Sequence, residues 1–321
     1  MTSRALVTGG AGFVAQWLER ALLERGWEVF AAGLGVPPAD GVLTSLERAS
    51  VRWMEADVRR TADVADALET SRPDAVFHLA GIAFLPAAAA DATAAYDVNV
   101  VGAARVVAAV SERRRGGALD PAVVVVGSGE QYGVHPADEL PLVETAEQRP
   151  LSVYAASKAA QEIVALQAAR ADGLRLVATR SFNHSGPGQA AHFLLPALVG
   201  RAVEARAAGR RAIAIGNPDP VRDYLHVEDV ATAYIALAEH GVPGECYNVC
   251  SGRGVTVREL AETVLQRLGV PADITVDPSL QRPVDLPALV GSPEKLCRAT
   301  GWSPRRTPSD IIDDLIHAQT H

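Results

Sequence analysis

The sequence predicts an α/β fold in which a doubly wound parallel sheet is combined with a smaller C-terminal α/β lobe. Between residue 4 and about residue 180, short β-branched runs alternate with longer helical patterns, as in stacked βαβ units. Residues 123–126 are four consecutive valines, which is typical of a strand that helices cover on both faces. After Phe182, shorter elements are separated by loops rich in glycine and proline.

Strands are expected, in chain order, at residues 5–8, 28–32, 51–55, 75–79, 122–126 and 175–179. Helices are expected between them at residues 13–24, 91–115 and 153–169. The loops that mark the change of rhythm lie at residues 185–189, 216–220 and 242–244. We therefore expect a first domain over residues 1–180 and a second over residues 181–321, interleaved with the first.

Composition and charge exclude several classes of protein. Of the 321 residues, 48% are hydrophobic and 21% are charged, as in an ordinary globular enzyme. The net charge of −8 provides no basic surface for a nucleic acid. The three cysteines form no pattern for a disulfide framework or a metal site, so no metal is expected. Residues 79–90 form the longest apolar stretch, well short of the ~20 residues that span a bilayer. We expect no membrane partner and a cytoplasmic location.

A glycine-rich turn follows the first expected strand. Gly9, Gly10 and Gly12 stand directly before the helix that is expected from Phe13. Glycines at such a turn let a pyrophosphate approach backbone N–H groups at the positive end of a helix. Because the turn lies at the first strand-to-helix junction of a βαβ series, it predicts dinucleotide binding and a Rossmann-type sheet.

The end of the second expected strand bears on the choice of cofactor. NAD-binding sheets place an acidic residue there, against the ribose 2′-hydroxyl. The sequence has Gly33, Leu34 and Gly35 instead. The missing carboxylate favours NADPH, since nothing would repel a 2′-phosphate, and NADH remains the alternative. Asp57, after the third strand, is a candidate to bind the adenine ring or, alternatively, a charge at a helix N-terminus.

Tyr154 and Lys158 are four residues apart on an expected helix, so their side chains share one face. A nearby ammonium favours the phenolate and can lower the pKa of a phenol by roughly 1–3 units. Tyr154 is therefore expected to exchange a proton near neutral pH. Ser128 follows the valine strand at its carboxyl end, the edge at which ligands of open α/β sheets bind.

With these motifs the chain resembles the extended short-chain dehydrogenase/reductase family over nearly its whole length. The resemblance rests on the glycine turn, residues 77–81, Asn99, Ser128 and the Tyr154/Lys158 pair. It implies that Ser128 orients a substrate carbonyl or hydroxyl, that Tyr154 is the acid/base, and that Lys158 also binds the nicotinamide ribose. The cofactor-binding residues that follow are Gly9, Gly12, Phe13, Val14, Asp57, Val58, Leu79, Ala80, Gly81, Asn99, Tyr154 and Lys158. Hydride transfer to a carbonyl creates negative charge on its oxygen, which Tyr154 and Ser128 can neutralise.

Residues 180–189, 222–230 and 282–285 resemble the nucleotide-sugar branch of this family, above all its GDP-4-keto-6-deoxy-mannose reductases. The resemblance implies a GDP-sugar substrate, with Arg222 and Arg282 on the pyrophosphate and Asn183 near the sugar. His184 and Asp285 are further candidates for substrate binding. The alternative for Arg222 is a surface salt bridge, for instance with its neighbour Asp223.

Other reactions of the same branch remain open. Glu130 matches the base of the GDP-mannose 4,6-dehydratases, although Gly129 stands where those enzymes carry a hydroxyl or carboxyl group. The arginine- and serine-rich loop of such dehydratases is also missing from residues 33–40. A 4-epimerase would share Ser128, Tyr154 and Lys158. A dinucleotide-binding regulator of the same fold would not need them.

Family members often dimerise through the two long helices that correspond to residues 91–115 and 153–169 of this chain. The resemblance therefore implies a homodimer with a four-helix interface.

Overall fold

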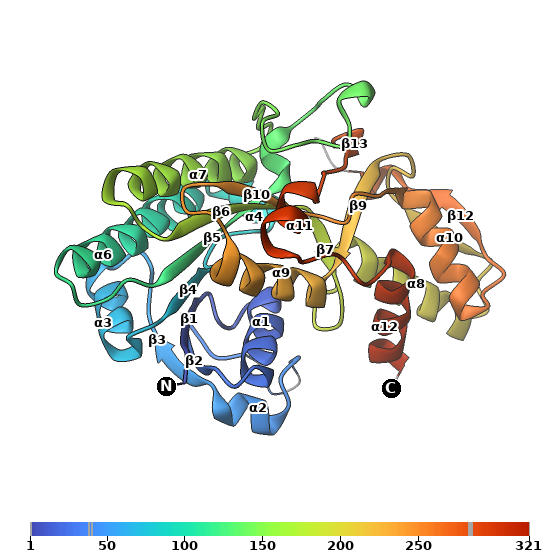
Figure 1. Cartoon of the computed structure of the whole chain (residues 1–321). Coiled ribbons are helices and arrows are strands. Elements are labelled where there is room, and N and C mark those ends of the chain that lie inside the picture. The colour runs from blue at the N-terminus through green and yellow to red at the C-terminus, as the bar shows by residue number, and fades with distance from the viewer. Residues whose placement is uncertain (1, 38, 40, 282–284, 321) are drawn as a thin grey trace.

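The computed structural model describes residues 2–37, 39, 41–281 and 285–320. A parallel sheet of seven strands runs through its centre (Figure 1). In spatial order the strands are β10 (Cys246–Val249), β6 (Leu176–Ser181), β5 (Ala122–Ser128), β4 (Ala75–His78), β1 (Arg4–Thr8), β2 (Glu28–Gly33) and β3 (Arg52–Glu55). The predicted α/β class and its doubly wound parallel sheet are confirmed.

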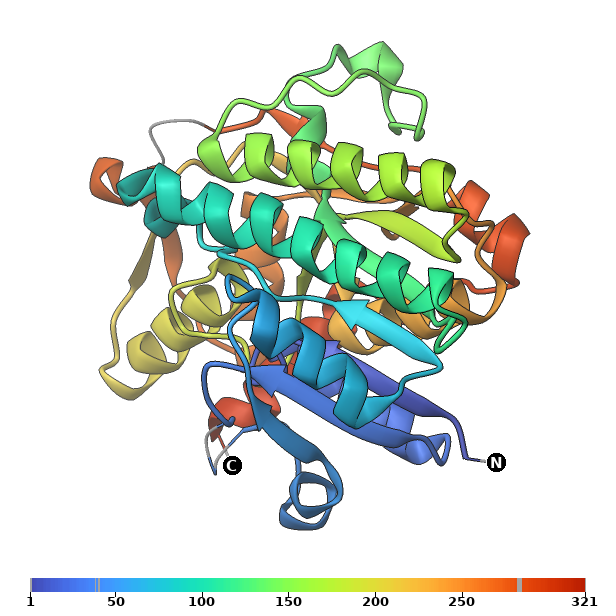
Figure 2. The same ribbon diagram turned by 90° about the vertical axis from the view of Figure 1, so that its left-hand side faces the viewer.

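Helices cover both faces of this sheet. On one face lie α1 (Phe13–Glu24) and α9 (Val227–His240). On the other lie α3 (Thr61–Ser71), α6 (Ala103–Arg115) and α7 (Val153–Asp172), which Figure 2 shows in front of the strands. Alternate residues of each strand point to the two faces. In β5, Val124 belongs to the core on the side of α1 and α9, while Val123 and Val125 belong to the core on the side of α3, α6 and α7.

The predicted strands all form, with ends that shift by up to two residues. β5 and β6 continue to Ser128 and Ser181 because their backbones stay hydrogen-bonded to that point. Strand β10 and helix α9 come from the second half of the chain, yet they complete the sheet and one of its helical layers. Segments on either side of residue 180 therefore share one core.

The remaining part of the second half forms a smaller lobe. One of its sheets contains β11 (Gly254–Thr256), β9 (Val221–His226), β13 (Ala288–Leu289) and β7 (Asn183–Ser185), and another pairs β12 (Asp273–Val276) with β8 (Ala212–Ile215). Its helices are α8 (Leu194–Ala207), α10 (Val257–Leu268) and α12 (Pro308–Thr320). These helices enclose a core of their own. The short helices of the chain are α2 (Ser45–Ser50), α4 (Leu85–Ala90), α5 (Ala92–Tyr96) and α11 (Glu294–Thr300).

The helix expected over residues 91–115 is helical but not uniform, because α5 leads into α6 through a π-helical segment, Asp97–Gly102. Asn99 in this segment is buried and hydrogen-bonds the backbone of Ile82 and the hydroxyl of Ser157. By length and composition alone, the stretch Ala92–Arg115 could cross a membrane. It packs against α3 and α7, and so serves as part of the layer over the sheet.

Candidate active site

A cavity of about 440 Å³ opens at the carboxyl ends of the central strands, between the sheet and the smaller lobe. Thirteen of the residues singled out in the sequence line it, from both halves of the chain. They are Gly9, Gly12, Phe13, Val14, Leu79, Ala80, Gly81, Ser128, Glu130, Tyr154, Lys158, Asn183 and His184. The structure thus brings together the glycine turn, the Tyr154/Lys158 pair and part of the candidate substrate side.

The glycine turn is tightly built. Gly9 has a φ of +72°, and a Cβ there would lie 2.8 Å from the backbone N and Cα of Ala80. Gly12 caps α1 and donates its N–H to the Gly9 carbonyl at 2.9 Å. Gly81 faces Lys158, because a Cβ there would lie 3.3 Å from the Nζ atom. The N-terminus of α1 therefore opens into the cavity without side chains in the way, which fits the pyrophosphate of a dinucleotide.

Tyr154 and Ser128 meet inside the cavity. Tyr154 stands in the first turn of α7, whose start is fixed by the Ser152 hydroxyl, which accepts the N–H of Ala155 at 3.1 Å. Its phenol hydrogen-bonds the Ser128 side chain. Burial and the Glu130 carboxylate raise the pKa of Tyr154 to about 12, against the lowering effect of the Ser128 hydrogen bond. The phenol is therefore protonated at neutral pH and suited to give up a proton.

The expectation that Lys158 lowers the pKa of Tyr154 is wrong. The Lys158 ammonium is buried and donates to the Val126 carbonyl at 2.8 Å and to the Gln161 side chain at 2.9 Å. Lys158 thus has hydrogen-bond partners of its own, and burial of the phenol, together with the Glu130 carboxylate, raises the pKa of Tyr154 instead. Burial also lowers the pKa of Lys158, to about 8.

Glu130 and Gly129 follow Ser128 in a short 3-10 turn. Glu130 lines the cavity. Gly129 packs on the ring of Phe182, and a Cβ at this position would lie 3.1 Å from that ring. Position 129 thus has little room for a side chain that could transfer a proton.

Asn183 and His184 reach the cavity from β7. The Nδ1–H of His184 donates to the Phe182 carbonyl at 2.9 Å, and its ring lies parallel to Phe13 with centroids 6.4 Å apart. Burial lowers the pKa of His184. The imidazole is therefore neutral at pH 7, and its Nε2 atom is a hydrogen-bond acceptor.

Arg222 is buried in β9 and ion-pairs with Asp285 rather than with Asp223. The expected alternative, a surface pair with Asp223, is wrong because neighbouring residues of a strand point to opposite faces. The Asp223 carboxylate instead accepts the N–H groups of Ser251 and Gly252. Arg222 and Asp285 do not themselves line the cavity, but Tyr224, two residues from Arg222 on β9, does. Arg282 lies outside the described residues.

Asp57 lines a second hollow of about 570 Å³ where β2 and β3 end, together with Leu34 and Arg60. Its carboxylate binds the guanidinium of Arg59 at 2.6 Å, and α3 begins only at Thr61, so Asp57 is not in the first turn of that helix. Val58 packs on the π-helical segment, where a Cβ on Gly102 would lie 2.8 Å from its methyl group.

Several residues that line the cavity carry no recognisable sequence signal. They are Leu85, Phe193 and Tyr234. Gln189 and Tyr224, which also line it, belong to the segments 180–189 and 222–230 that carry the resemblance. Tyr234, for example, is a helix residue whose hydroxyl lies 2.7 Å from the Ser181 hydroxyl. It reaches the site only because α9 folds back onto the sheet.

Known proteins are similar to this chain over both of its lobes. The family model described as GDP-mannose 4,6 dehydratase matches residues 6–315. The chain is 33% identical over 320 residues to the GDP-6-deoxy-D-mannose reductase of Pseudomonas aeruginosa, an alignment that covers 98% of this chain and 97% of that protein. RMD from Pseudomonas aeruginosa complexed with NADPH superposes with a TM-score of 0.80 at 28% identity, with 98% of both chains covered. The UDP-glucose 4-epimerase of Thermus thermophilus, in complex with NAD, superposes with a TM-score of 0.81 at 30% identity over 98% of both chains.

Proposed function

This chain belongs to the GDP-mannose 4,6-dehydratase family, within the extended short-chain dehydrogenases/reductases, and from that premise we propose that it reduces a sugar nucleotide. The substrate is a GDP-4-keto-6-deoxy-hexose, whose 4-keto group becomes the hydroxyl of a GDP-6-deoxy sugar of the GDP-D-rhamnose type. The observation that carries this proposal is the protonated Tyr154 phenol, hydrogen-bonded to Ser128 inside the cavity that also holds the glycine turn.

In this reaction a bound nicotinamide cofactor would supply the hydride to the carbonyl carbon. The chain supplies the proton. As the C=O bond becomes a C–O single bond, its oxygen gains negative charge and takes the proton of Tyr154, while the Ser128 hydroxyl donates a hydrogen bond to it. The Lys158 ammonium, which faces Gly81, would bind the nicotinamide ribose, and Tyr154 regains its proton from water.

NADPH is the proposed cofactor ahead of NADH. β2 ends at Gly33, so no carboxylate at this position would repel a 2′-phosphate. RMD from Pseudomonas aeruginosa, which has a similar fold, was solved with NADPH, and the similar epimerase with NAD. Both cofactors therefore belong in the assay.

The dehydratase is the second candidate, since Glu130 lines the cavity near Tyr154. The elimination of water needs a further proton donor beside the base. Gly129 provides none, and the contact with Phe182 leaves it little room for one. This difference favours the reductase. An epimerase shares the catalytic residues and differs by having no net redox change.

The deciding experiment incubates the protein with GDP-4-keto-6-deoxy-mannose and either NADPH or NADH, and follows the absorbance of the reduced nicotinamide. Oxidation of one equivalent of cofactor per sugar supports the reductase. No oxidation, together with loss of water from GDP-mannose, would establish the dehydratase instead. Interconversion of 4-epimers without net cofactor use would establish the epimerase. Parallel reactions with the UDP- and dTDP-linked sugars test the preference for GDP.

On the substrate side, Arg222 remains our proposed ligand for the pyrophosphate.

The proposed oligomer is a homodimer in which α6 and α7 pack against their copies. These two helices lie side by side on one outer face of the molecule (Figure 2). Apolar side chains on this stretch of chain are exposed, among them Val101 at 41% and Ile163 at 65%.

A further inference from the structure

A buried polar bridge lies directly behind Ser128 and connects it to α7. Its members are Gln131, Glu162 and Arg180, all of which are buried. We propose that Gln131 is a positioning residue, whose side-chain amide is held by the Glu162 carboxylate and in turn holds the Ser128 backbone in register with Tyr154. This inference rests on the proposed function.

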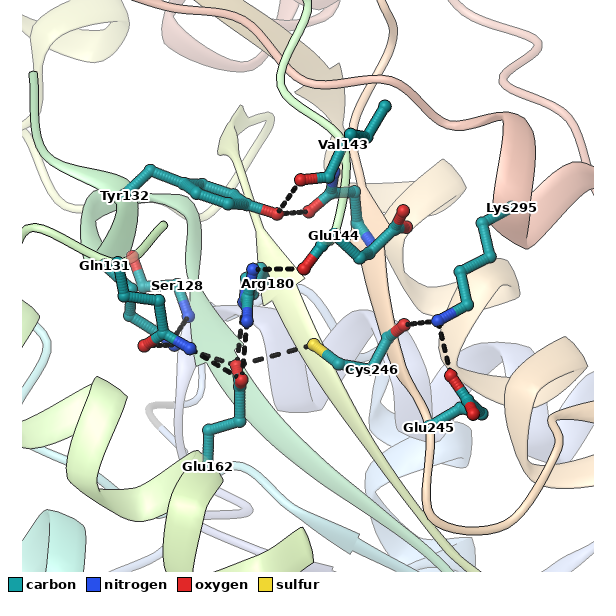
Figure 3. Close-up of polar contacts among 12 residues, drawn as sticks. Ser128, Gln131, Tyr132, Val143, Glu144, Glu162, Arg180, Glu245, Cys246 and Lys295 are labelled. Carbon is teal, nitrogen blue, oxygen red and sulfur yellow. Dashed lines mark hydrogen bonds and ion pairs between the residues drawn. The ribbon is translucent and has the colours of Figure 1, made fainter. Parts of the chain in front are cut away.

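The contacts form an unbroken series (Figure 3). Ser128 donates its N–H to the Gln131 Oε1 atom at 2.8 Å. The Gln131 Nε2 group donates to Glu162 at 2.9 Å. Arg180 binds the same carboxylate through two hydrogen bonds, at 2.9 Å from its Nε and 2.7 Å from its Nη2.

The chemistry of the partners fixes the orientation of the Gln131 amide. A carboxylate only accepts hydrogen bonds and a backbone N–H only donates, so a flipped amide would lose both contacts. Burial alone would raise the pKa of Glu162, but the hydrogen bonds from Arg180 bring it below its usual range. Glu162 is therefore ionised at neutral pH and keeps the amide aligned.

The backbone beneath the bridge leaves room for it. A Cβ on Gly127 would lie 2.6 Å from the Gln131 Oε1 atom and 2.3 Å from the Thr179 carbonyl. The glycine before Ser128 thus allows the amide to reach the N–H of Ser128. Gly127 therefore serves the contact between Gln131 and Ser128, whereas Gly9 and Gly12 serve the cofactor turn.

The bridge joins the two elements that carry the reacting pair. Tyr154 and Glu162 both stand on α7, whereas Ser128 ends β5. A connection from Glu162 through Gln131 to Ser128 therefore sets the separation of the strand end from the helix, and with it the Ser128–Tyr154 hydrogen bond. An error of about 1 Å in such an arrangement can lower turnover about 10²-fold.

The test compares Gln131→Met with Gln148→Met. Gln148 also binds Glu162, at 2.8 Å, and accepts a longer hydrogen bond from Gln131, at 3.3 Å. Among the described residues no hydrogen bond joins Gln148 to Ser128, so it serves as the matched control. We expect Gln131→Met to lower kcat by about 10²-fold, with the KM and the Kd for NADPH close to those of the wild type. Gln148→Met should retain nearly all of kcat. Equal losses in the two variants would overturn the proposal.

A double-mutant cycle separates positioning from general damage to the fold. If Gln131 acts through Ser128, then adding Gln131→Met to Ser128→Ala should change kcat little further. A second loss as large as the first would contradict the proposal. Where Gln131→Met does not fold, Gln131→Glu is compared with the exchange Gln131→Glu/Glu162→Gln. The exchange keeps an acceptor for Ser128 and one negative charge, and it should recover kcat relative to Gln131→Glu.

One readout does not depend on the reaction. Hydrogen exchange of the Ser128 amide, measured without substrate, should accelerate in Gln131→Met and remain slow in Gln148→Met. If the wild-type protein fails to oxidise NADPH with the keto sugar, the proposed function fails and this exchange still decides the role of Gln131. Unchanged exchange in Gln131→Met would refute the bridge even in an active reductase.

Discussion

Tyr154 is the residue on which the proposed chemistry depends. A change to Phe keeps the ring and removes the proton donor next to Ser128. We expect Tyr154→Phe to lower kcat by about 10²–10⁴-fold, the range typical of a lost general acid. Steady-state kinetics with the keto sugar and NADPH checks this, with NADPH binding measured as the control for folding. Near-normal turnover would remove Tyr154 from the mechanism.

Lys158 gives the reaction a predicted pH dependence. Burial lowers the pKa of Lys158 to about 8, while the pKa of Tyr154 is about 12. Between these values the ammonium loses its charge as the pH rises, and the phenol remains protonated. We therefore expect kcat/KM for reduction to fall as the pH rises through about 8. In Lys158→Arg, whose guanidinium stays charged, the residual activity should show no such fall; a fall at the same pH would assign the titration to another group.

Glu19 links folding stability to pH. Its side chain is fully buried in α1, neither carboxylate oxygen has a partner among the described residues, and burial raises its pKa to about 9. Because the folded pKa exceeds the unfolded value of 4.5, the stability that Glu19 contributes is fully present below pH 4.5 and is lost as the pH rises through about 9. Between pH 4.5 and about 9, the contribution of Glu19 to the free energy of unfolding falls by about 1.4 kcal/mol per pH unit.

The variant Glu19→Gln tests this link, because an amide of the same shape does not titrate. Urea unfolding at several values between pH 5 and 8 should show the variant gaining stability over the wild type as the pH rises. A difference between the two proteins that stays constant with pH would show that Glu19 is ionised in the folded state.

At the scale of elements, the π-helical segment Asp97–Gly102 aligns the loop after β4 with α7. Asn99 accepts the N–H of Ile82 at 2.8 Å and donates to the Ser157 hydroxyl at 2.8 Å. We expect Asn99→Ala to reduce the free energy of unfolding by about 1–3 kcal/mol, because buried partners lose their hydrogen bonds. Urea titration measures this loss. Asn99→Asp keeps the acceptor for Ile82 but sets a buried carboxylate against the Ile82 carbonyl that Asn99 donates to at 3.2 Å, so it should lose at least as much; a smaller loss would place the effect elsewhere.

At the scale of the whole molecule, the proposed homodimer predicts that a charge placed on the interface between the subunits will separate them. Ile163 is 65% exposed on α7 in the single chain. We expect Ile163→Glu to convert a dimer into a monomer, because a carboxylate buried between two apolar helices would lack a partner. Light scattering coupled to size-exclusion chromatography measures the mass. Leu280→Glu, at an apolar residue that is 39% exposed and lies outside α6 and α7, is the control and should leave the mass unchanged.

The sequence by itself determined the α/β class, the six strands of the first half and the elements that carry Gly9, Ser128 and Tyr154. It could do so because period-2 and period-3.6 patterns and glycine turns are local properties of the chain. The tertiary structure alone decided that β10 and α9 complete the main sheet, that Arg222 pairs with Asp285, and that Gln131 bridges Glu162 to Ser128. Most of these contacts join residues far apart in sequence, as between Gln131 and Glu162, whereas the contact of Gln131 with Ser128 spans only three residues. The raised pKa of Tyr154 also belongs to this second group, because it depends on how deeply the phenol is buried and on where Lys158 finds its partners.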